Sequence, residues 1–268
     1  MLRTRALSAL VLIPVAAWVI WAGDWWFFAA ILLVAGLAGY EFTQLMRQGG
    51  FNPAPIFVLA LIGLSLFDAQ FPSLAIAAPG LTWILILSIS WQLFQSKDKV
   101  PTANWALSIA GGLYVGWLSA HAVRLRALPD GLTWTIIAVL VTWIGDTAAY
   151  FVGSAIGRHK LWPRLSPRKT WEGILGGMLG SLLTGSGVGY LMTLWMGVDI
   201  SPGQGLIVGL LGGIIGPFGD LAISMMKRQV NAKDSGRIIP GHGGFLDRSD
   251  SLLFVLTATY YYAVWFAR

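Results

Sequence analysis

The 268-residue sequence contains no cysteine and few charged residues. Without cysteine the chain forms no disulfide, no zinc–thiolate site and no catalytic thiolate. Lys, Arg, Asp and Glu together make up only 11% of the residues, against about 25% in soluble domains. Hydrophobic residues make up 56%. This composition excludes a disordered chain and a coiled coil, and it indicates a protein that lies mostly in lipid.

The hydrophobic residues form runs that are suited to cross a membrane as helices. A helix crosses the hydrocarbon core with about 20 residues, within a range of roughly 17–25. The sequence therefore predicts an all-α, polytopic membrane protein with about nine transmembrane helices. The expected spans are Ala6–Trp21, Trp25–Tyr40, Pro55–Phe67, Leu74–Phe94, Ala103–Val123, Leu132–Val152, Ile174–Val198, Gly205–Ile223 and Ser251–Phe266.

Basic residues are distributed unevenly among the segments that connect these spans. With the N-terminus in the cytoplasm and the C-terminus outside, 15 of the 18 Lys and Arg residues fall in cytoplasmic segments. Only Arg124, Arg126 and Arg268 fall outside. This segregation follows the positive-inside rule. Topology thus explains most of the net charge of +6, and we expect no nucleic-acid partner.

The connecting segments are short except for residues 153–173 and 224–250, both expected on the cytoplasmic side. We expect one integrated membrane domain. Residues 1–130 supply about five N-terminal spans, and residues 131–268 form a C-terminal catalytic region that contains the two long loops. Glycines four residues apart, as in Gly205, Gly209 and Gly213, predict close packing of helices. A homodimer through such small-residue faces is a further expectation.

More than half of the charged residues lie in segments 146–173 and 220–250, where acidic residues are interleaved with basic ones. The positive-inside rule does not account for carboxylates there. Asp146 lies inside an otherwise apolar span, where an ionised group costs about 3 kcal/mol. We therefore expect Asp146 to face the interior of the helix bundle and to have a partner. A structural hydrogen bond is the alternative, although a neutral Asn or Ser would serve that purpose.

A second carboxylate, Asp220, follows Pro217 at the cytoplasmic end of the eighth span, and Pro217 is expected to break or kink this helix. Asp220, Ser224 and Lys227 share one helix face, because they are spaced at i, i+4 and i+7. A carboxylate, a hydroxyl and an ammonium group in this order are suited to hold a divalent ion and a phosphate together. Kinking and capping are the alternative, but they do not require the lysine.

Segment 236–244 contains four glycines in nine residues. Glycine lets backbone N–H groups approach an anion closely. Asp247 follows and is placed to reach a metal ion, whereas Ser249 or Asp250 can cap the last helix. His242 lies between glycines and is more typical of a hydrogen-bonding loop residue than of a general base.

These residue types favour one class of chemistry. Three carboxylates, many cations and no Ser–His–Asp or Cys–His set argue against nucleophilic hydrolysis. They are typical of phosphoryl or nucleotidyl transfer, in which Mg²⁺ held by one or two carboxylates bridges the substrate phosphates. Oxygen ligands and the lack of cysteine favour magnesium over zinc.

The second half of the sequence resembles the phosphatidate cytidylyltransferases, also called CDP-diacylglycerol synthases. The resemblance extends from Ser224 to Asp250 and is strongest there, while the first half is similar only in length and number of spans. Segments 146–151 and 166–173 also resemble that family. Two positions depart from its pattern: Ser249 stands where an aliphatic residue is usual, and Ile223 stands where many members carry Glu. The shared pattern is Ser224-Met-Met-Lys227-Arg228, then Lys233-Asp234-x-Gly236-x-x-Ile239-Pro240-x-His242-Gly243-Gly244-Phe245-x-Asp247-Arg248-x-Asp250.

The resemblance implies transfer of CMP from CTP to phosphatidic acid, which gives CDP-diacylglycerol and pyrophosphate. It implies Mg²⁺ held by Asp220 and Asp247, with Asp146 as a further acidic group and Lys227 as a catalytic cation. A second, monovalent cation is left open. The membrane implied is the inner, cytoplasmic membrane of a bacterium, with the site facing the cytoplasm. The residues expected to bind CTP or phosphatidate are Ser166, Arg168, Lys169, Thr170, Ser224, Arg228, Lys233, Asp234, His242, Gly243, Gly244, Arg248 and Asp250.

Two other functions are open at this point. A CTP-dependent lipid kinase would use similar groups on a hydroxyl acceptor, but the length of the pattern after Ser224 argues against it. An ion or metabolite transporter also carries carboxylates within the membrane. Transporters often show inverted repeats in both halves, whereas the unusual residues here lie in one half and on one expected membrane side.

Overall fold

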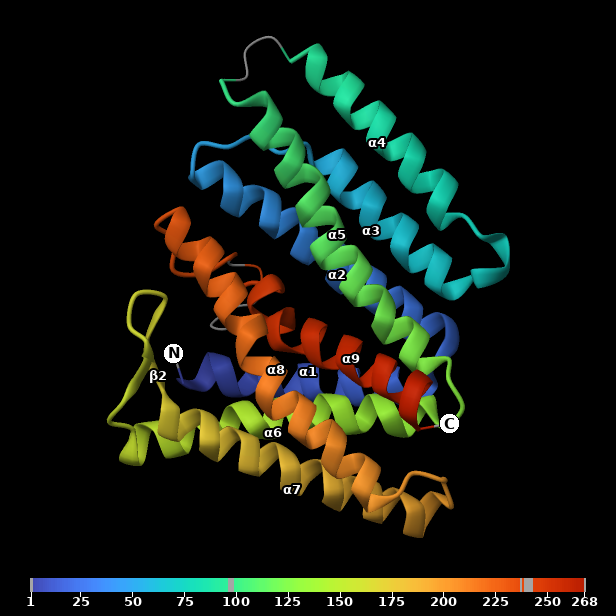
Figure 1. Cartoon of the computed structure of the whole chain (residues 1–268), viewed down its shortest axis with the longest axis vertical. Helices are drawn as coiled ribbons and strands as arrows, with labels where there is room; N and C mark the ends of the chain where they lie inside the picture. Colours follow the sequence, from blue (N-terminus) through green and yellow to red (C-terminus); the bar gives the residue numbers. More distant parts are fainter. Residues whose placement is uncertain (1, 96–98, 237, 239–242, 268) are drawn as a thin grey trace. The chain divides into compact units, whose positions relative to one another are not determined.

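The computed structural model describes residues 2–95, 99–236, 238 and 243–267, with side chains described from residue 10 onward. This described part contains nine α-helices, one 3₁₀ helix (η1, Pro72–Leu74) and two short strands (Figure 1). The helices are α1 (Leu2–Ala22), α2 (Asp24–Gln48), α3 (Pro55–Gln70), α4 (Ala77–Leu93), α5 (Pro101–Arg126), α6 (Gly131–Ile156), α7 (Trp171–Met196), α8 (Pro202–Gln229) and α9 (Leu246–Phe266).

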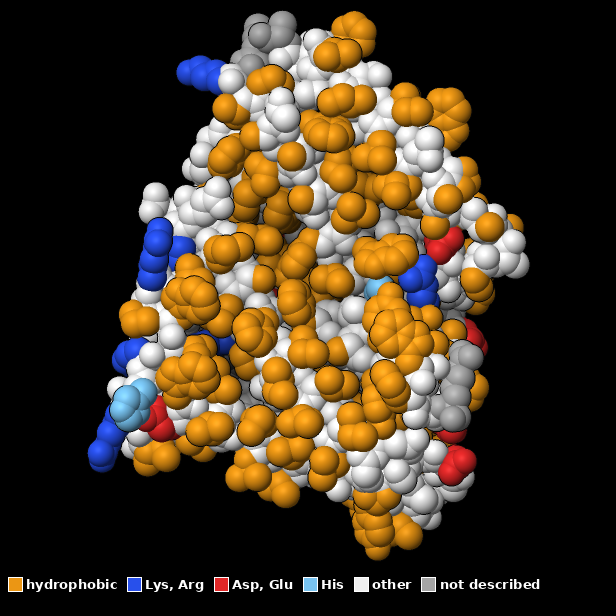
Figure 2. Space-filling view, viewed as in Figure 1, with side chains coloured by type: hydrophobic (Ala, Val, Ile, Leu, Met, Phe, Trp, Pro, Cys, Tyr) orange, Lys and Arg blue, Asp and Glu red, His pale blue; other side chains and the backbone are white. Residues whose placement is uncertain are grey.

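Each span expected from the sequence coincides with one helix. Among the described residues, α2, α5, α6, α7 and α8 are long and apolar enough to cross a membrane. Helices α3 and α4 are apolar but shorter, with 16 and 17 residues. Hydrophobic side chains dominate the face of the molecule in Figure 2, and many of them are large and exposed. The chain is therefore an integral membrane protein. The number of spans and their direction stay predictions.

The chain divides into two compact units. The first unit contains Met1–Arg124 and Met226–Ser249, and the second contains Leu125–Met225 and Asp250–Arg268. Residues 226–249 group with the N-terminal helices, because Glu41 of α2 bonds directly to Leu246 and to Ser235. The division expected from the sequence, after residue 130 within one integrated domain, stays a prediction.

The core of the first unit is built around α3. Leu61, Ile62 and Leu66 are almost fully buried. Gly39 of α2 packs against Ile62, and Gly116 of α5 lies so close that an added Cβ would stand 2.6 Å from the Cα of Ile62. Glycine thus lets the helices approach closely without a side chain between them.

Glycine faces also join α6, α7 and α8 in the second unit. Gly145 of α6 packs against Ser181 of α7, whose hydroxyl donates a 3.0 Å hydrogen bond to the Val141 carbonyl. Gly213 of α8 packs against Met178, where an added Cβ would lie 2.7 Å from the Met178 Cα. These faces are occupied by helices of the same chain. The homodimer stays a prediction and would have to use another surface.

Helix α8 runs through Pro217 without interruption. Pro217 therefore does not break the helix, and the kink that was the other expectation stays a prediction. A helix interior accommodates proline when the surrounding helices hold it in place, at the cost of one backbone hydrogen bond.

The all-α expectation misses a small antiparallel pair of strands between α6 and α7. Strand β1 (Lys160–Trp162) pairs with β2 (Ser166–Thr170), with Lys160 opposite Thr170. Pro163 and Pro167 disfavour a helix in this segment. At the end of β2, the Thr170 hydroxyl accepts a 3.1 Å hydrogen bond from the Gly173 N–H and caps α7.

Candidate active site

The second unit contains a small polar group that we call the Asp220 cluster: Lys169, Asp220 and Ser224. Lys169 Nζ lies 2.7 Å from Asp220 Oδ2, and the Ser224 hydroxyl donates to Asp220 Oδ1 at 3.3 Å. Lys169 Nζ also lies 3.5 Å from the Pro217 carbonyl. The Asp220 side chain is 35% exposed. Its carboxylate therefore meets one cation and one hydroxyl and stays open to solvent.

Two elements bring these three residues together. Asp220 and Ser224 are one turn apart in α8, so their side chains lie on the same face. Lys169 comes from β2, whose pairing with β1 holds it next to α8. The i, i+4 relation predicted from the sequence is thus confirmed for Asp220 and Ser224. The role of the strands was not anticipated.

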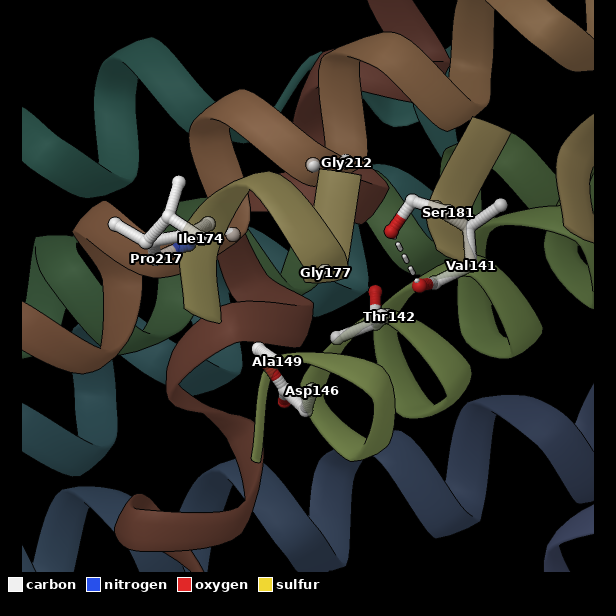
Figure 3. A pocket seen from close by; sticks show the side chains of 12 residues that line it. Val141, Thr142, Asp146, Ala149, Ile174, Gly177, Ser181, Gly212 and Pro217 are labelled. Carbon is white, nitrogen blue, oxygen red and sulfur yellow. Dashed lines mark hydrogen bonds between the residues drawn. The ribbon is translucent and has the colours of Figure 1, made fainter. Parts of the chain in front are cut away.

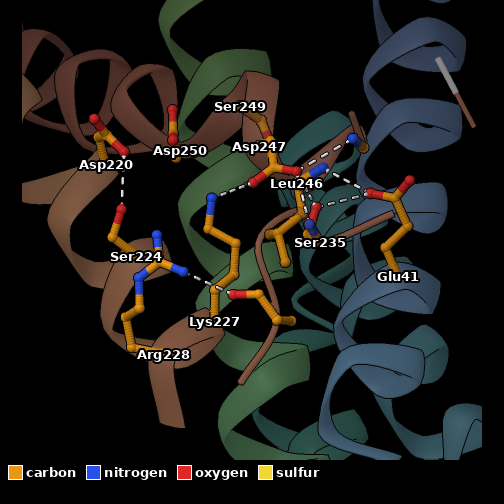
Figure 4. Close-up of polar contacts among 12 residues, drawn as sticks. Glu41, Asp220, Ser224, Lys227, Arg228, Ser235, Leu246, Asp247, Ser249 and Asp250 are labelled. Carbon is orange, nitrogen blue, oxygen red and sulfur yellow. Dashed lines mark hydrogen bonds and ion pairs between the residues drawn. The ribbon is translucent and has the colours of Figure 1, made fainter. Parts of the chain in front are cut away.

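The first unit contains a second polar group, the Asp247 cluster: Glu41, Lys227, Ser235 and Asp247 (Figure 4). Lys227 Nζ donates to Asp247 Oδ1 at 2.7 Å. Asp247 Oδ2 accepts from the Ser235 N–H and from the Ser235 hydroxyl, both at 2.8 Å, and from the Gly244 N–H at 3.2 Å. The Lys227 and Asp247 side chains are only 12% and 9% exposed.

These contacts set the charge state of Asp247. Burial raises the pKa of Asp247, but the hydrogen bond and charge of Lys227 and the hydrogen bonds from Ser235 lower it more. The net effect is a pKa below the usual value of an aspartate. Asp247 is therefore ionised at neutral pH, as a partly buried carboxylate with a cation and backbone donors should be.

The two clusters differ in how well they suit a metal ion. Within the described residues, no three His, Asp or Glu side chains are grouped so that they could hold one. Asp220 fits a hard cation in part, because its exposed carboxylate retains lone pairs and Mg²⁺ needs only one or two carboxylates besides phosphate oxygens. Asp247 fits less well, because four donors already contact it.

Asp146 lies beside a cavity of about 20 Å³ among α6, α7 and α8 of the second unit (Figure 3). Glycines 177, 212 and 213 line the same cavity, which has room for a single water molecule. The Asp146 side chain is exposed at the rim of this cavity, on the side of α6 that faces α7 and α8. Its role as an acidic group of the active site stays a prediction. Gly145 is the residue that packs against α7, and its neighbour Asp146 points about 100° further round the helix.

The other residues expected to bind substrate from the segment before α7 differ in exposure. Ser166 and Lys169 are half-buried on β2, and Arg168 is exposed between them. Thr170 is buried, and its hydroxyl caps α7. Arg168 is therefore the side chain of this group that a soluble ligand can reach most easily.

The segment after α8 shows a similar range. Lys233, Asp234 and Arg248 are exposed. Arg228 is exposed and donates to the Ala232 carbonyl at 3.1 Å. In the second unit, Asp250 Oδ1 accepts from the Ser251 N–H at 2.7 Å. Helix α9 begins at Leu246, so Ser249 and Asp250 lie inside it, and the expectation that one of them caps this helix is wrong.

The glycine segment is described only in part. Gly243 has a positive φ of 84°, and Gly244 is buried beside Asp247. Residue 243 thus adopts a backbone conformation that favours glycine. His242 lies outside the described residues.

Sequence reasoning missed two residues of the Asp247 cluster, Glu41 and Ser235. Glu41 is 3% exposed, and its Oε2 accepts a 3.0 Å hydrogen bond from the Leu246 N–H. A signal for Glu41 was present, because it is an acidic residue beside an apolar run, as Asp146 is. Ser235 gave no signal, since a serine in a polar loop is common.

Comparisons with known proteins give one matching family model and several similar relatives. A family model described as "Cytidylyltransferase family" matches residues 3–266. A phosphatidate cytidylyltransferase of Synechocystis sp. is 38% identical over an alignment of 289 positions, which covers 97% of this chain and 96% of the relative. Proteins of the same name from Staphylococcus epidermidis and Staphylococcus aureus (strain COL) are 38% and 47% identical. They cover 76% and 60% of this chain, and the same shares of their own lengths.

Proposed function

Because the chain belongs to the cytidylyltransferase family and is an enzyme of that family, we propose that it transfers CMP from CTP to phosphatidic acid. The products are CDP-diacylglycerol and pyrophosphate, and the role is phospholipid biosynthesis. The observation that supports this most is the Asp247 cluster, in which a buried carboxylate holds Lys227 in one orientation. We take the two substrates from the name of the Synechocystis relative, phosphatidate cytidylyltransferase, which this chain resembles along nearly its full length.

The reaction that we propose needs no strong general base. The second pKa of a phosphate monoester is about 6, so phosphatidate is largely ionised near neutral pH. Its phosphate oxygen attacks the α-phosphorus of CTP in line with the bond to the leaving pyrophosphate. The requirement on the protein is then to position both phosphates and to stabilise the negative charge.

Lys227 and Lys169 are the cations best placed for this task. An ammonium group has three N–H donors, and Lys227 directs one of them to Asp247. Lys169 is held in the same way by Asp220. Each lysine can thus contact a phosphate oxygen while its carboxylate keeps it in place. Exposed Arg168, Arg228 and Arg248 add positive charge for the triphosphate or for the lipid head group.

Asp220 would hold a magnesium ion, and that ion would supply positive charge to offset the charge of the substrate phosphates. Asp220 presents the open carboxylate for it, and Ser224 orients Oδ1. Asp247 as a second magnesium ligand and Asp146 as a further acidic group stay predictions. A monovalent second cation also stays a prediction.

We place the enzyme in the bacterial inner membrane, with its N-terminus and both long loops in the cytoplasm. The uneven distribution of Lys and Arg supports this direction. A cytoplasmic site would meet soluble CTP from one side and phosphatidate from the membrane.

A direct assay tests the proposal. Purified protein is supplied with CTP, phosphatidic acid and Mg²⁺, and both CDP-diacylglycerol and pyrophosphate are measured. We expect the two products in equal amounts and a requirement for all three additions. A phosphorylated lipid together with CDP would instead indicate a CTP-dependent lipid kinase, and the absence of any product would overturn the proposal.

A further inference from the structure

Glu41 joins the N-terminal helices to the beginning of α9 within the first unit. Helix α9 begins at Leu246, and the first N–H groups of a helix have no partner within the helix. Glu41 Oε2, on α2, accepts the Leu246 N–H at 3.0 Å. A carboxylate at this end of a helix also interacts favourably with the helix dipole. Glu41 therefore caps α9 from 205 residues away in the sequence.

The Glu41 carboxylate is buried and packed closely against the surrounding backbone. Its side chain is 3% exposed. A Cβ on Gly236 or on Gly244 would overlap the Glu41 carboxylate, so both positions require glycine while Glu41 is there. Two glycines that first suggested anion binding thus make room for an acidic side chain of the protein itself.

Ser235 connects Glu41 with Asp247. The Ser235 hydroxyl has a single proton, and it lies 2.8 Å from Asp247 Oδ2 and 3.5 Å from Glu41 Oε2. The shorter distance assigns the stronger hydrogen bond to Asp247. Asp247 also directly follows Leu246, whose N–H donates to Glu41 at the start of α9. A shift of Glu41 would therefore move Asp247 along two routes, through Ser235 and through the first turn of α9.

From this geometry we propose that Glu41 is a positioning residue for the transfer reaction. It touches neither CTP nor phosphatidate. By capping α9 and bordering Ser235, it holds Asp247 where Asp247 orients Lys227 toward the reacting phosphates. This inference rests on the function proposed above and deepens it. It also gives the N-terminal half, which shows few distinctive residues in the sequence, a part in the reaction.

Steady-state kinetics of two substitutions test the proposal. Glu41→Leu removes the acceptor, and we expect kcat to fall about 100-fold, because small displacements of a catalytic group have effects of this size. Glu41→Gln keeps an acceptor for the Leu246 N–H, so it should restore much of the loss and leave kcat within about tenfold of wild type. The KM values for CTP and phosphatidate should change by less than about threefold in both variants. Asp24→Asn, an exposed acidic position on the same helix, is the control and should match wild type.

A double variant separates positioning from general stability. If Glu41 acts through Lys227, then Glu41→Leu should lower kcat little further when Lys227 is already alanine, because coupled residues are not additive. A full additional loss in the double variant would overturn the proposal. So would unchanged kinetics of Glu41→Leu, or an equal loss in Glu41→Leu and Glu41→Gln with a parallel fall in unfolding temperature.

The failure of this inference can be told from the failure of the proposed function. An active wild type whose Glu41→Leu variant is equally active overturns only the role of Glu41. A wild type that makes no CDP-diacylglycerol overturns the function, and with it the role of Glu41 in that reaction. Hydrogen exchange at the Leu246 N–H gives a check that does not require activity. It should be faster in Glu41→Leu than in wild type, and an unchanged rate would contradict the capping contact.

Discussion

The Asp220 and Asp247 clusters each contain one aspartate paired with one lysine at 2.7 Å, yet their surroundings are very different. Asp220 is 35% exposed, and a lysine and a serine contact it. Asp247 is 9% exposed and accepts hydrogen bonds from a lysine, a serine hydroxyl and two backbone N–H groups. The same ion pair is thus open in one unit and closed in the other.

The difference indicates a division of tasks between two similar pairs. An exposed carboxylate exchanges ligands readily and suits a metal ion that arrives with its nucleotide. A buried carboxylate with four donors is costly to rearrange, and it suits the fixed orientation of a lysine. Four substitutions or conditions test this comparison, and they are given in order of decreasing expected effect.

Replacing the open carboxylate should have the largest effect. In Asp220→Asn the side chain keeps its size but loses its charge, so it holds a divalent ion poorly and no longer pairs with Lys169. We expect CDP-diacylglycerol formation to fall about 1000-fold, as when a major electrostatic contribution is removed. The unfolding temperature should change little, because an ion pair this exposed contributes about 1 kcal/mol or less. The measurement is initial rate at saturating CTP and Mg²⁺.

Asp199→Asn is the matched control, since Asp199 is an exposed aspartate of the same unit. It should retain wild-type activity. A fully active Asp220→Asn would show that the open carboxylate holds no metal ion needed for the reaction.

Replacing the closed carboxylate should affect both activity and stability. In Asp247→Asn the charge that orients Lys227 is lost, and we expect activity to fall about 100-fold. Removing one partner of a buried pair also costs about 3 kcal/mol of folding free energy. The measurements are turnover and thermal unfolding in the same detergent. A large loss of activity with unchanged stability would remove the contrast with Asp220.

The lysine of the open cluster should matter less than either aspartate. Lys169→Ala leaves Asp220 in place and removes one of several cations that we propose contact the triphosphate, so we expect about a tenfold rise in KM for CTP. Added salt should reduce the difference in KM for CTP between this variant and wild type, because exposed charges are screened. Lys160→Ala, an exposed lysine on the paired strand, is the control. A tenfold rise in that variant as well would indicate a general effect of positive charge rather than a specific contact.

Much of the fold could be predicted because hydrophobic runs report membrane helices directly. Every expected span has its helix, and the ends differ by at most eight residues, at the end of α2. The strand pair around Pro163 was missed because two strands of three and five residues give no periodic signal. The sequence did not indicate that α8 continues through Pro217 without a break. The local cost of a proline in a helix can be read from the sequence, but the packing of neighbouring helices that offsets this cost cannot.

The candidate site was predictable only where its residues are close in sequence. Asp220 and Ser224 are four residues apart, so helix geometry alone places them together. Lys169 reaches Asp220, and Glu41 reaches Leu246 and Ser235 beside Asp247, from distant segments of the chain. No spacing rule indicates such contacts. Asp146 stands out in the sequence as a carboxylate in an apolar span, but hydropathy does not tell that it is exposed at the rim of a cavity.

The smallest effect expected concerns acid, and it uses the lowered pKa of Asp247. A carboxylate whose pKa is lower in the folded state contributes stability above its unfolded pKa, which is about 4, and this contribution is lost as the pH falls through the folded pKa. Lys227→Met removes the main partner that lowers this pKa. Wild type should therefore be more stable than Lys227→Met at neutral pH. As the pH falls, this difference in stability should narrow as Asp247 becomes protonated, first in the variant, where burial still raises the pKa and Lys227 no longer lowers it, and then in wild type. Thermal unfolding between about pH 7 and about pH 3 measures the difference. A difference that stays constant over this range would mean that Asp247 is not the group that titrates, and that the closed cluster is held together by something other than its charge.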